Sequence, residues 1–254
     1  MRVVSNKLTQ ILIAGSLTLI STSAFAGTQT ITFDDIGLDH GEIVNTQFAG
    51  VTISAENYSD GPDLAVAFDT TLSNTRDSDL EGPSWGNNNL GQFGINANTY
   101  VTGNALIIQE NSYKCYDDNV CNRPDDEGSR PAGIVTFEFD TAISSLGFDL
   151  IDFQDVEVTG SNVTFFNDAL ESISYTFASF VGGVHNAVYG DNSLNRIMIS
   201  SIGINNANKA VFDFGGSGAV DTIVYNSTTQ VPEPGTLTLF GLALAGLFIR
   251  KARK

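Results

Sequence analysis

Basic side chains are scarce in this sequence, and half of them lie close to its two ends. Only 12 of the 254 residues are lysine or arginine, against 29 acidic residues. Between Gly27 and Gln230 there are 28 acidic residues and six basic ones, a net charge of about −22. Such a surface repels nucleic acid, because nucleic-acid binding depends on cationic contacts to phosphate. It suits a soluble domain and can attract divalent cations, the alternative being that the charge serves solubility alone.

Histidine and cysteine are also scarce, which limits the catalytic chemistry available. With only His40, His185 and two cysteines, no His/Cys cluster has the ligand spacing of a zinc site. Any serine-hydrolase mechanism would depend on one of these two histidines. Carboxylates are so numerous that a close acidic pair is unavoidable by chance, so it does not indicate a glycosidase. We therefore expect a protein that is not an enzyme.

Helical periodicity is missing between residues 27 and 225. Short apolar or alternating runs recur there instead, separated by Gly, Asn and Asp. Val135, Phe137 and Phe139, for example, fall on one face at period two. The pattern predicts an all-β fold, an antiparallel and jelly-roll-like β-sandwich. The expected strands are residues 28–33, 50–54, 64–68, 105–109, 134–139, 146–151, 163–166, 173–177, 196–202, 210–214 and 219–225.

Two stretches break the rhythm of the strands, residues 69–102 and 111–133. Both are rich in Asn, Gly, Asp or Ser, and the first contains the single tryptophan. Long loops in a compact domain are either functional or mobile, so candidate binding residues are sought here.

The first 26 residues have the order of a signal peptide. Arg2 and Lys7 precede the apolar residues 8–20, and Ala24 and Ala26 complete an Ala-x-Ala cleavage site. Signal peptidase would cut after Ala26 and leave Gly27 as the new N-terminus. The alternative is a membrane anchor, which a short apolar stretch ending in small polar residues disfavours.

The C-terminal segment has a different order. Pro232, Glu233 and Pro234 come first, residues 235–249 are apolar, and four of the last five residues are basic. As a transmembrane helix, the apolar segment would span roughly 22 Å, short of the ~30 Å hydrocarbon core, so the bilayer would have to thin locally. The basic end would lie in the cytoplasmic headgroups of the inner membrane. The prolines favour an extended segment that a processing enzyme can grip.

This C-terminal order resembles the PEP-CTERM sorting signal. The resemblance implies recognition by an exosortase, a membrane transpeptidase, with cleavage near Pro232-Glu233-Pro234 after transient contact with the inner membrane. It also implies a Gram-negative bacterium that makes extracellular polysaccharide. The alternative is an uncleaved single-pass anchor. We divide the chain into a signal peptide (1–26), an ectodomain (27–225), a linker (226–230) and a sorting signal (231–254).

The ectodomain also resembles a group of uncharacterised PEP-CTERM ectodomains. The resemblance implies the same fold and location and brings no established activity. The matching segments are residues 31–35, 50–53, 68–70, 77–80, 104–110, 125–128 with Gly133, and 216–223.

Cys115 and Cys121 are the only cysteines, six positions apart. Because export leads to an oxidising compartment, we expect them to form a disulfide. Closing so short a loop stabilises a fold by about 2 kcal/mol in the chain-entropy account.

Three aspartates are candidate metal ligands. Asp34 and Asp35 end the first expected strand, and Asp221 lies in the last one. First and last strands of jelly-roll modules can lie side by side, so these carboxylates would meet around one structural Ca²⁺, an ion that takes oxygen ligands. The alternative is separate, solvated aspartates. Asp77 and Asp79 also have oxygen-ligand spacing, without matching an EF-hand loop.

Trp85, Asn87 and Tyr100 are the candidate ligand-binding residues. Aromatic faces stack on the apolar faces of sugar rings, while amide groups supply hydrogen bonds. The alternative is that Trp85 fills the core and the neighbouring asparagines form a turn.

Three functions follow in order of preference. The first is an exported protein of the cell surface, outer envelope or extracellular matrix (including biofilm matrix), processed by an exosortase, with a structural or adhesive ectodomain. The second is a lectin-like module that recognises extracellular polysaccharide. The third is a secreted hydrolase.

Overall fold

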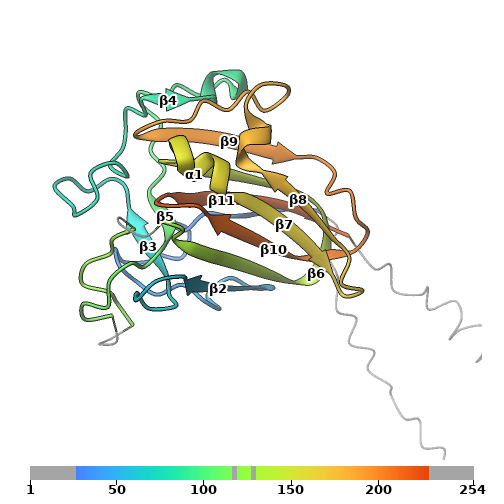
Figure 1. Ribbon diagram of the computed structural model, residues 1–254, viewed down its shortest axis with the longest axis horizontal. Helices are drawn as coiled ribbons and strands as arrows, with labels where there is room; N and C mark the ends of the chain where they lie inside the picture. Colours follow the sequence, from blue (N-terminus) through green and yellow to red (C-terminus); the bar gives the residue numbers. More distant parts are fainter. Residues whose placement is uncertain (1–26, 116–118, 127–129, 229–254) are drawn as a thin grey trace, which may run out of the picture.

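The computed structural model describes residues 27–115, 119–126 and 130–228 (Figure 1). These residues form eleven strands, one short α-helix and two 3₁₀ turns. The strands are β1 (Thr28–Ile31), β2 (Val51–Asn57), β3 (Ala65–Asp69), β4 (Asn87–Asn88), β5 (Asn104–Ile108), β6 (Gly133–Ile151), β7 (Asn162–Asn167), β8 (Ser172–Thr176), β9 (Ser193–Ile199), β10 (Ala207–Phe214) and β11 (Ala219–Ser227). The helical segments are η1 (Leu90–Phe93), α1 (Asp155–Gly160) and η2 (Phe177–Phe180).

The strands follow the period-two pattern of the sequence. Val135, Phe137 and Phe139 are buried on one face of β6, whereas Glu138 between them is exposed. The prediction of an all-β, antiparallel fold is confirmed, with one parallel pairing between β4 and β9. The expected strands at 134–139 and 146–151 are wrong as separate elements, because β6 runs through both of them.

β6 changes its neighbours along its length. It pairs with β2 over residues 133–139 and with β10 over residues 133–138 and at Ile143. Farther along, it pairs with β11 over residues 143–151 and with β9 over residues 146–151. The sheet therefore divides at β6 into a part with β2, β10, β7 and β8 and a part with β9, β11, β5 and β3. Phe148 of the second part meets Phe212 of the first edge to face, with ring centroids 4.9 Å apart. The main core contains side chains from both parts of the sheet, Phe148 and Phe212 among them.

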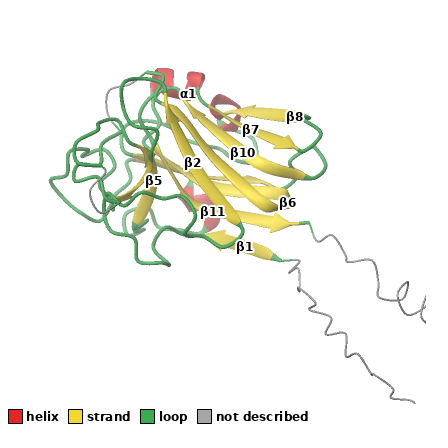
Figure 2. Cartoon of the chain, turned by 90° about the horizontal axis from the view of Figure 1, so that it is seen from below, coloured by secondary structure: helices red, strands yellow, loops and turns green. Residues whose placement is uncertain are grey.

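A second apolar cluster covers the opposite face of the β3–β5–β11–β6 part. Side chains alternate along β6, so that Phe148 and Leu150 enter the main core while Ile151 enters the second cluster. Leu80, Trp85 and the disulfide-bonded Cys115 and Cys121 close this cluster from the long loops. The described residues of the two irregular stretches therefore cover one face of the sheet, and we call them the loop cover. Figure 2 shows loops gathered at one end of the strands.

The first and last strands lie side by side. β1 pairs antiparallel with β11, so that Ile31 is opposite Ile223. β11 continues to Ser227, two residues beyond the end expected for the ectodomain. The predicted signal peptide and its cleavage site at Ala24 and Ala26, and the sorting signal with Pro232, Glu233 and Pro234, lie outside the described residues. Within the described ranges, no helix is both long enough and apolar enough to cross a membrane.

The short helix α1 was not expected from the sequence. It begins after Gln154, whose side chain and that of Glu157 form a reciprocal capping box with the backbone. Arg130 pairs with the buried Glu157 at 2.7 Å and fixes the loop before β6 against this helix.

Candidate metal centre

The predicted chain-end site is only partly assembled. The carboxylate of Asp34 accepts a hydrogen bond of 2.7 Å from the backbone N–H of Asn104 and lies close enough to Asp221 to raise its pKa. Asp35 is exposed in the turn that follows β1. Among the described residues, Asp34, Asp35 and Asp221 do not bring three carboxylate oxygens together at ligand separations.

Asp221 belongs instead to a buried polar row across three strands. It lies opposite Asp149 on β6, which lies opposite Arg196 on β9. Burial, and then the charge of Asp149, raise the pKa of Asp221 well above its usual range. One carboxylate oxygen of Asp221 is buried without a hydrogen-bond donor.

A second group of aspartates does assemble. Asp79, Asp152 and Asp191 each place one carboxylate oxygen within 4.8 Å of the others. Asp79 comes from the loop between β3 and β4, Asp152 directly follows β6, and Asp191 precedes β9. Asp152 is buried, Asp79 is half-buried and Asp191 is exposed, so solvent reaches the group at Asp191.

Two further aspartates lie behind this group. Asp77 and Asp126 are 2% and 3% exposed. No donor reaches either oxygen of Asp77, and Asp126 receives a single hydrogen bond of 2.6 Å, from the N–H of Gly218. The two carboxylates face each other. The negative charge of Asp77 raises the pKa of Asp152, and the negative charge of Asp152 raises the pKa of Asp126. We call these five residues, Asp77, Asp79, Asp126, Asp152 and Asp191, the five-aspartate cluster.

The cluster is electrostatically strained when it holds only carboxylates. Burial, and then the neighbouring charges of Asp79, Asp77 and Asp191, raise the pKa of Asp152 to about 8, against the lowering effect of a backbone hydrogen bond from Asn192. Burial, and then Asp77, also raise the pKa of Asp126 well above its usual range. In the described part of the chain, no ion pair joins a lysine or arginine to any of the five.

Asn192 holds the cluster in place. Its backbone N–H donates to Asp152 at 2.7 Å, and its side-chain amide donates to the carbonyl oxygens of Asp79 and Glu81 at 2.8 and 3.1 Å. Asp152 and Asn192 both have positive φ, 58° and 50°, a region in which Asp and Asn are the best tolerated residues after Gly. The chain thus bends sharply at Asp152, which is a member of the cluster, and at Asn192, whose amide groups contact Asp152 and Asp79.

The sequence gives a signal for only part of this cluster. Asp77 and Asp79 have oxygen-ligand spacing within one loop. Asp126, Asp152 and Asp191 carry no such pattern, because their approach depends on which strands become neighbours.

The predicted ligand-binding residues do not form an exposed platform. Trp85 is 2% exposed in the second cluster, and its indole N–H donates to the carbonyl of Tyr100 at 3.2 Å. Asn87 pairs with Ser193 in the sheet, and the Tyr100 hydroxyl accepts a hydrogen bond from Arg196. The expectation of a Trp85 stacking face is corrected, because the ring is buried by the loop cover.

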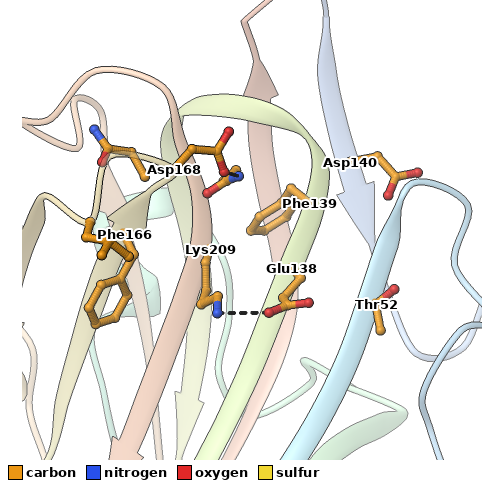
Figure 3. A pocket seen from close by; sticks show the side chains of 10 residues that line it. Thr52, Glu138, Phe139, Asp140, Phe166, Asp168 and Lys209 are labelled. Carbon is orange, nitrogen blue, oxygen red and sulfur yellow. Dashed lines mark hydrogen bonds and ion pairs between the residues drawn. The ribbon is translucent and has the colours of Figure 1, made fainter.

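A groove elsewhere carries both aromatic and polar side chains (Figure 3). It has a volume of about 480 Å³ and is lined by residues of β2, β6, β10 and β7 and of the turn between β7 and β8. Glu138, Lys209 and Phe166 are cross-strand neighbours, and Lys209 pairs with Glu138 at 2.9 Å. The rest of the lining is Thr52, Phe139, Asp140, Asn167, Asp168, Leu170 and Asn208.

One sequence pattern outside our predictions is Gly82-Pro-Ser-Trp-Gly86, which has the Gly-x-Ser-x-Gly spacing of a nucleophile elbow. That elbow joins a strand to a helix and needs a histidine within reach. Here the segment lies in a loop before β4, and Ser84 is exposed with a φ of 90°. In the described residues, no hydrogen bond joins Ser84 to His40 or His185. The spacing alone therefore does not make a hydrolase site.

The comparison with known families concerns the other end of the chain. The family described as the PEP-CTERM protein-sorting motif matches residues 230–254. The chain carries a PEP-CTERM sorting motif. The motif implies an exported, envelope-associated protein that an exosortase processes. No curated protein matches the chain.

We call the strands β1 to β11 and the loops between them the β-body. The PEP-CTERM motif follows the β-body directly. β11 ends at Ser227, and the matched region begins three residues later. The five-aspartate cluster and the groove lie within the body, so both would remain in the protein after cleavage at the PEP-CTERM motif.

Proposed function

We propose that this chain is a structural or adhesive protein of the cell surface or extracellular matrix of a Gram-negative bacterium, and that its β-body is not an enzyme. Signal peptidase would remove residues 1–26, and an exosortase would cut near Pro232-Glu233-Pro234. The PEP-CTERM motif at residues 230–254 carries this proposal. The jelly-roll-like sandwich expected for the body belongs to the same proposal.

The short connection between body and motif supports the proposal. β11 ends at Ser227, two residues before the matched region. Cleavage near Pro232 would therefore release or transfer a β-body whose last strand is intact. The disulfide between Cys115 and Cys121 is consistent with a protein that matures in an oxidising compartment.

Mass spectrometry of the protein isolated from the producing cells tests the proposal. We expect a mature chain that begins at Gly27 and ends near Pro232. A Pro232→Ala/Glu233→Ala/Pro234→Ala variant should retain its C-terminal tail, whereas a Thr229→Ala control should be processed normally. Recovery of the wild-type chain with residues 1–254 intact would contradict the proposal.

Structural calcium between the chain ends remains part of this proposal. The negative charge of Asp34 contributes to the raised pKa of the buried Asp221, and one carboxylate oxygen of Asp221 has no hydrogen-bond donor. An Asp221→Asn variant should lose part of any shift in melting temperature that Ca²⁺ causes. An equal shift in wild type and variant would remove this site.

A lectin-like role is the second candidate, and the groove of Figure 3 favours it. Phe166 offers an aromatic surface beside Asp168, Asn208 and the Lys209–Glu138 pair, a combination that suits sugar rings and hydroxyls. A polysaccharide pull-down should show binding that Phe166→Ala weakens and that Phe93→Ala, at an exposed aromatic outside the groove, leaves intact. No binding by the wild type, or equal binding by both variants, would reject this role.

A further inference from the structure

Three residues of the five-aspartate cluster have carboxylate oxygens at separations that fit the coordination shell of one Ca²⁺ ion. Calcium binds oxygens at 2.3–2.6 Å, so two ligands on opposite sides of the ion lie up to about 5 Å apart. Asp79, Asp152 and Asp191 each place an oxygen within 4.8 Å of the other two. The three carboxylates can therefore contact a single ion without a change of backbone.

The buried pair behind them is a separate indication of a cation. Asp77 is 2% exposed, and neither of its oxygens receives a hydrogen bond. One oxygen of Asp126 is in the same condition. A buried carboxylate normally has hydrogen-bond donors, a basic partner or a metal ion, because removing its charge from water is costly. Within the described residues, donors are too few and a basic partner is not seen.

Two arrangements relieve this excess of negative charge. The carboxylates can take up protons, or they can share a divalent cation. Proton uptake lowers the negative charge of the close pair Asp77 and Asp126, but it leaves the other three carboxylates together. Proton uptake does not explain why the half-buried Asp79 and the exposed Asp191 lie next to Asp152, because like charges repel each other. A shared cation would hold these three carboxylates together.

We propose that the five-aspartate cluster binds Ca²⁺, with Asp79, Asp152 and Asp191 as direct ligands and Asp77 and Asp126 as the inner source of negative charge. The donor set is made of oxygens only, which suits Ca²⁺ and excludes a zinc site of the usual N/S type. Mg²⁺ is smaller, requires near-octahedral geometry and keeps most of its water, so a cluster rich in protein carboxylates favours Ca²⁺.

The ion would join segments that are distant in the sequence. Asp77 and Asp79 lie in the loop between β3 and β4, and Asp126 lies in the loop between β5 and β6. Asp152 directly follows β6, and Asp191 precedes β9. These two loops form the cover over the second apolar cluster. Calcium would thus fasten the cover to the sheet, in a chain that meets Ca²⁺ outside the cell.

Isothermal titration calorimetry and thermal unfolding test the proposal on the protein isolated from the producing cells, after treatment with EDTA. We expect CaCl₂ to raise the melting temperature by several degrees, because a ligand that binds only the native state stabilises it, and MgCl₂ to act much more weakly. Asp152→Asn and Asp191→Asn should each weaken calcium binding at least tenfold. Asp77→Asn should weaken it as well.

Asp60→Asn is the matched control, because Asp60 is an exposed aspartate outside the cluster. It should bind Ca²⁺ like the wild type. Asp191→Asn keeps the test valid if Asp152→Asn does not fold, since Asp191 is exposed and its amide variant should be tolerated. No response of the wild type to 10 mM CaCl₂ would overturn the proposal, as would an unchanged calcium affinity in both Asp152→Asn and Asp191→Asn. These results do not depend on exosortase processing, so the two proposals can fail separately.

Discussion

Asp149 and Arg196 form a bidentate ion pair inside the protein. The guanidinium Nε and Nη2 donate to the two carboxylate oxygens at 2.8 and 2.6 Å, and the carboxylate of Asp149 is fully buried. Arg196 also donates to the hydroxyl of Tyr100 at 2.8 Å. The pair stands beside Asp221, so one guanidinium balances a region that holds two buried carboxylates.

The first prediction concerns the loss of this guanidinium. We expect Arg196→Met to lower the free energy of unfolding by about 3–5 kcal/mol, because it leaves a buried carboxylate without its partner. Urea unfolding of both proteins measures the change. Lys209→Met is the control, because it breaks the exposed pair with Glu138 and should cost less than about 1 kcal/mol. Equal costs for the two variants would contradict the prediction.

The second prediction concerns His40 and pH. The Nδ1 atom of His40 accepts a hydrogen bond of 3.0 Å from the backbone N–H of Asp69, and its ring lies edge-on against Phe68. Burial lowers the pKa of His40 below its usual value, although the nearby charge of Asp69 opposes this. The unfolded chain therefore binds a proton at a higher pH than the folded chain. The contribution of His40 to stability is fully present above about pH 6.5 and is lost as the pH falls below that value.

His40→Asn isolates this contribution, because an amide oxygen can accept the same hydrogen bond but cannot be protonated. We expect the difference in urea midpoint between wild type and His40→Asn to change in favour of the variant between pH 7.5 and pH 5. A difference that stays constant over this range would show that His40 titrates alike in both states. Carboxylates with raised pKa values are common to both proteins and cancel in the comparison.

Most strands could be predicted from the sequence, because they alternate or carry a short apolar run, whereas the two-residue β4 (Asn87–Asn88) does neither. The break expected in β6 was wrong for a physical reason. Asp140, Thr141 and Ala142 look like the start of a turn, yet they remain extended where β6 changes its neighbours. Polar residues are acceptable at that point because the strand is exposed there.

The candidate site could be predicted only in part. Asp77 and Asp79 are recognisable because they share one loop, whereas Asp152 and Asp191 are 39 positions apart in the numbering and meet only because β6 pairs with β9. The chain-end prediction placed the first strand beside the last one, as β1 and β11 are, and Asp35 lies exposed in the turn after β1. Period-two patterns specify strands and their faces, while loop paths and strand order decide which carboxylates converge.

The third prediction concerns Trp85. Its burial among Leu80, Leu90 and the cystine indicates a packing role, so Trp85→Ala should lower the free energy of unfolding by about 3–5 kcal/mol. Trp85→Phe should cost less, because most of the ring volume remains. Tyr113→Ala, at an aromatic residue that is 44% exposed, is the control and should cost little. A Trp85→Ala protein of unchanged stability that had lost polysaccharide binding would restore the stacking hypothesis.

The fourth prediction concerns the disulfide between Cys115 and Cys121. Both sulfurs are buried in the second apolar cluster, and the bond closes a loop with a sequence separation of six. In the chain-entropy account, so short a loop contributes about 2 kcal/mol, which corresponds to a fall of roughly 4–8 °C in melting temperature on reduction. A thermal scan with and without dithiothreitol measures this fall.

The Cys115→Ser/Cys121→Ser variant is the control, because it has no bond to reduce and its melting temperature should not respond. If the reductant lowers the melting temperature of both proteins equally, the effect does not come from this bond. If it leaves the wild type unchanged although free thiols have appeared, the disulfide does not stabilise the loop cover.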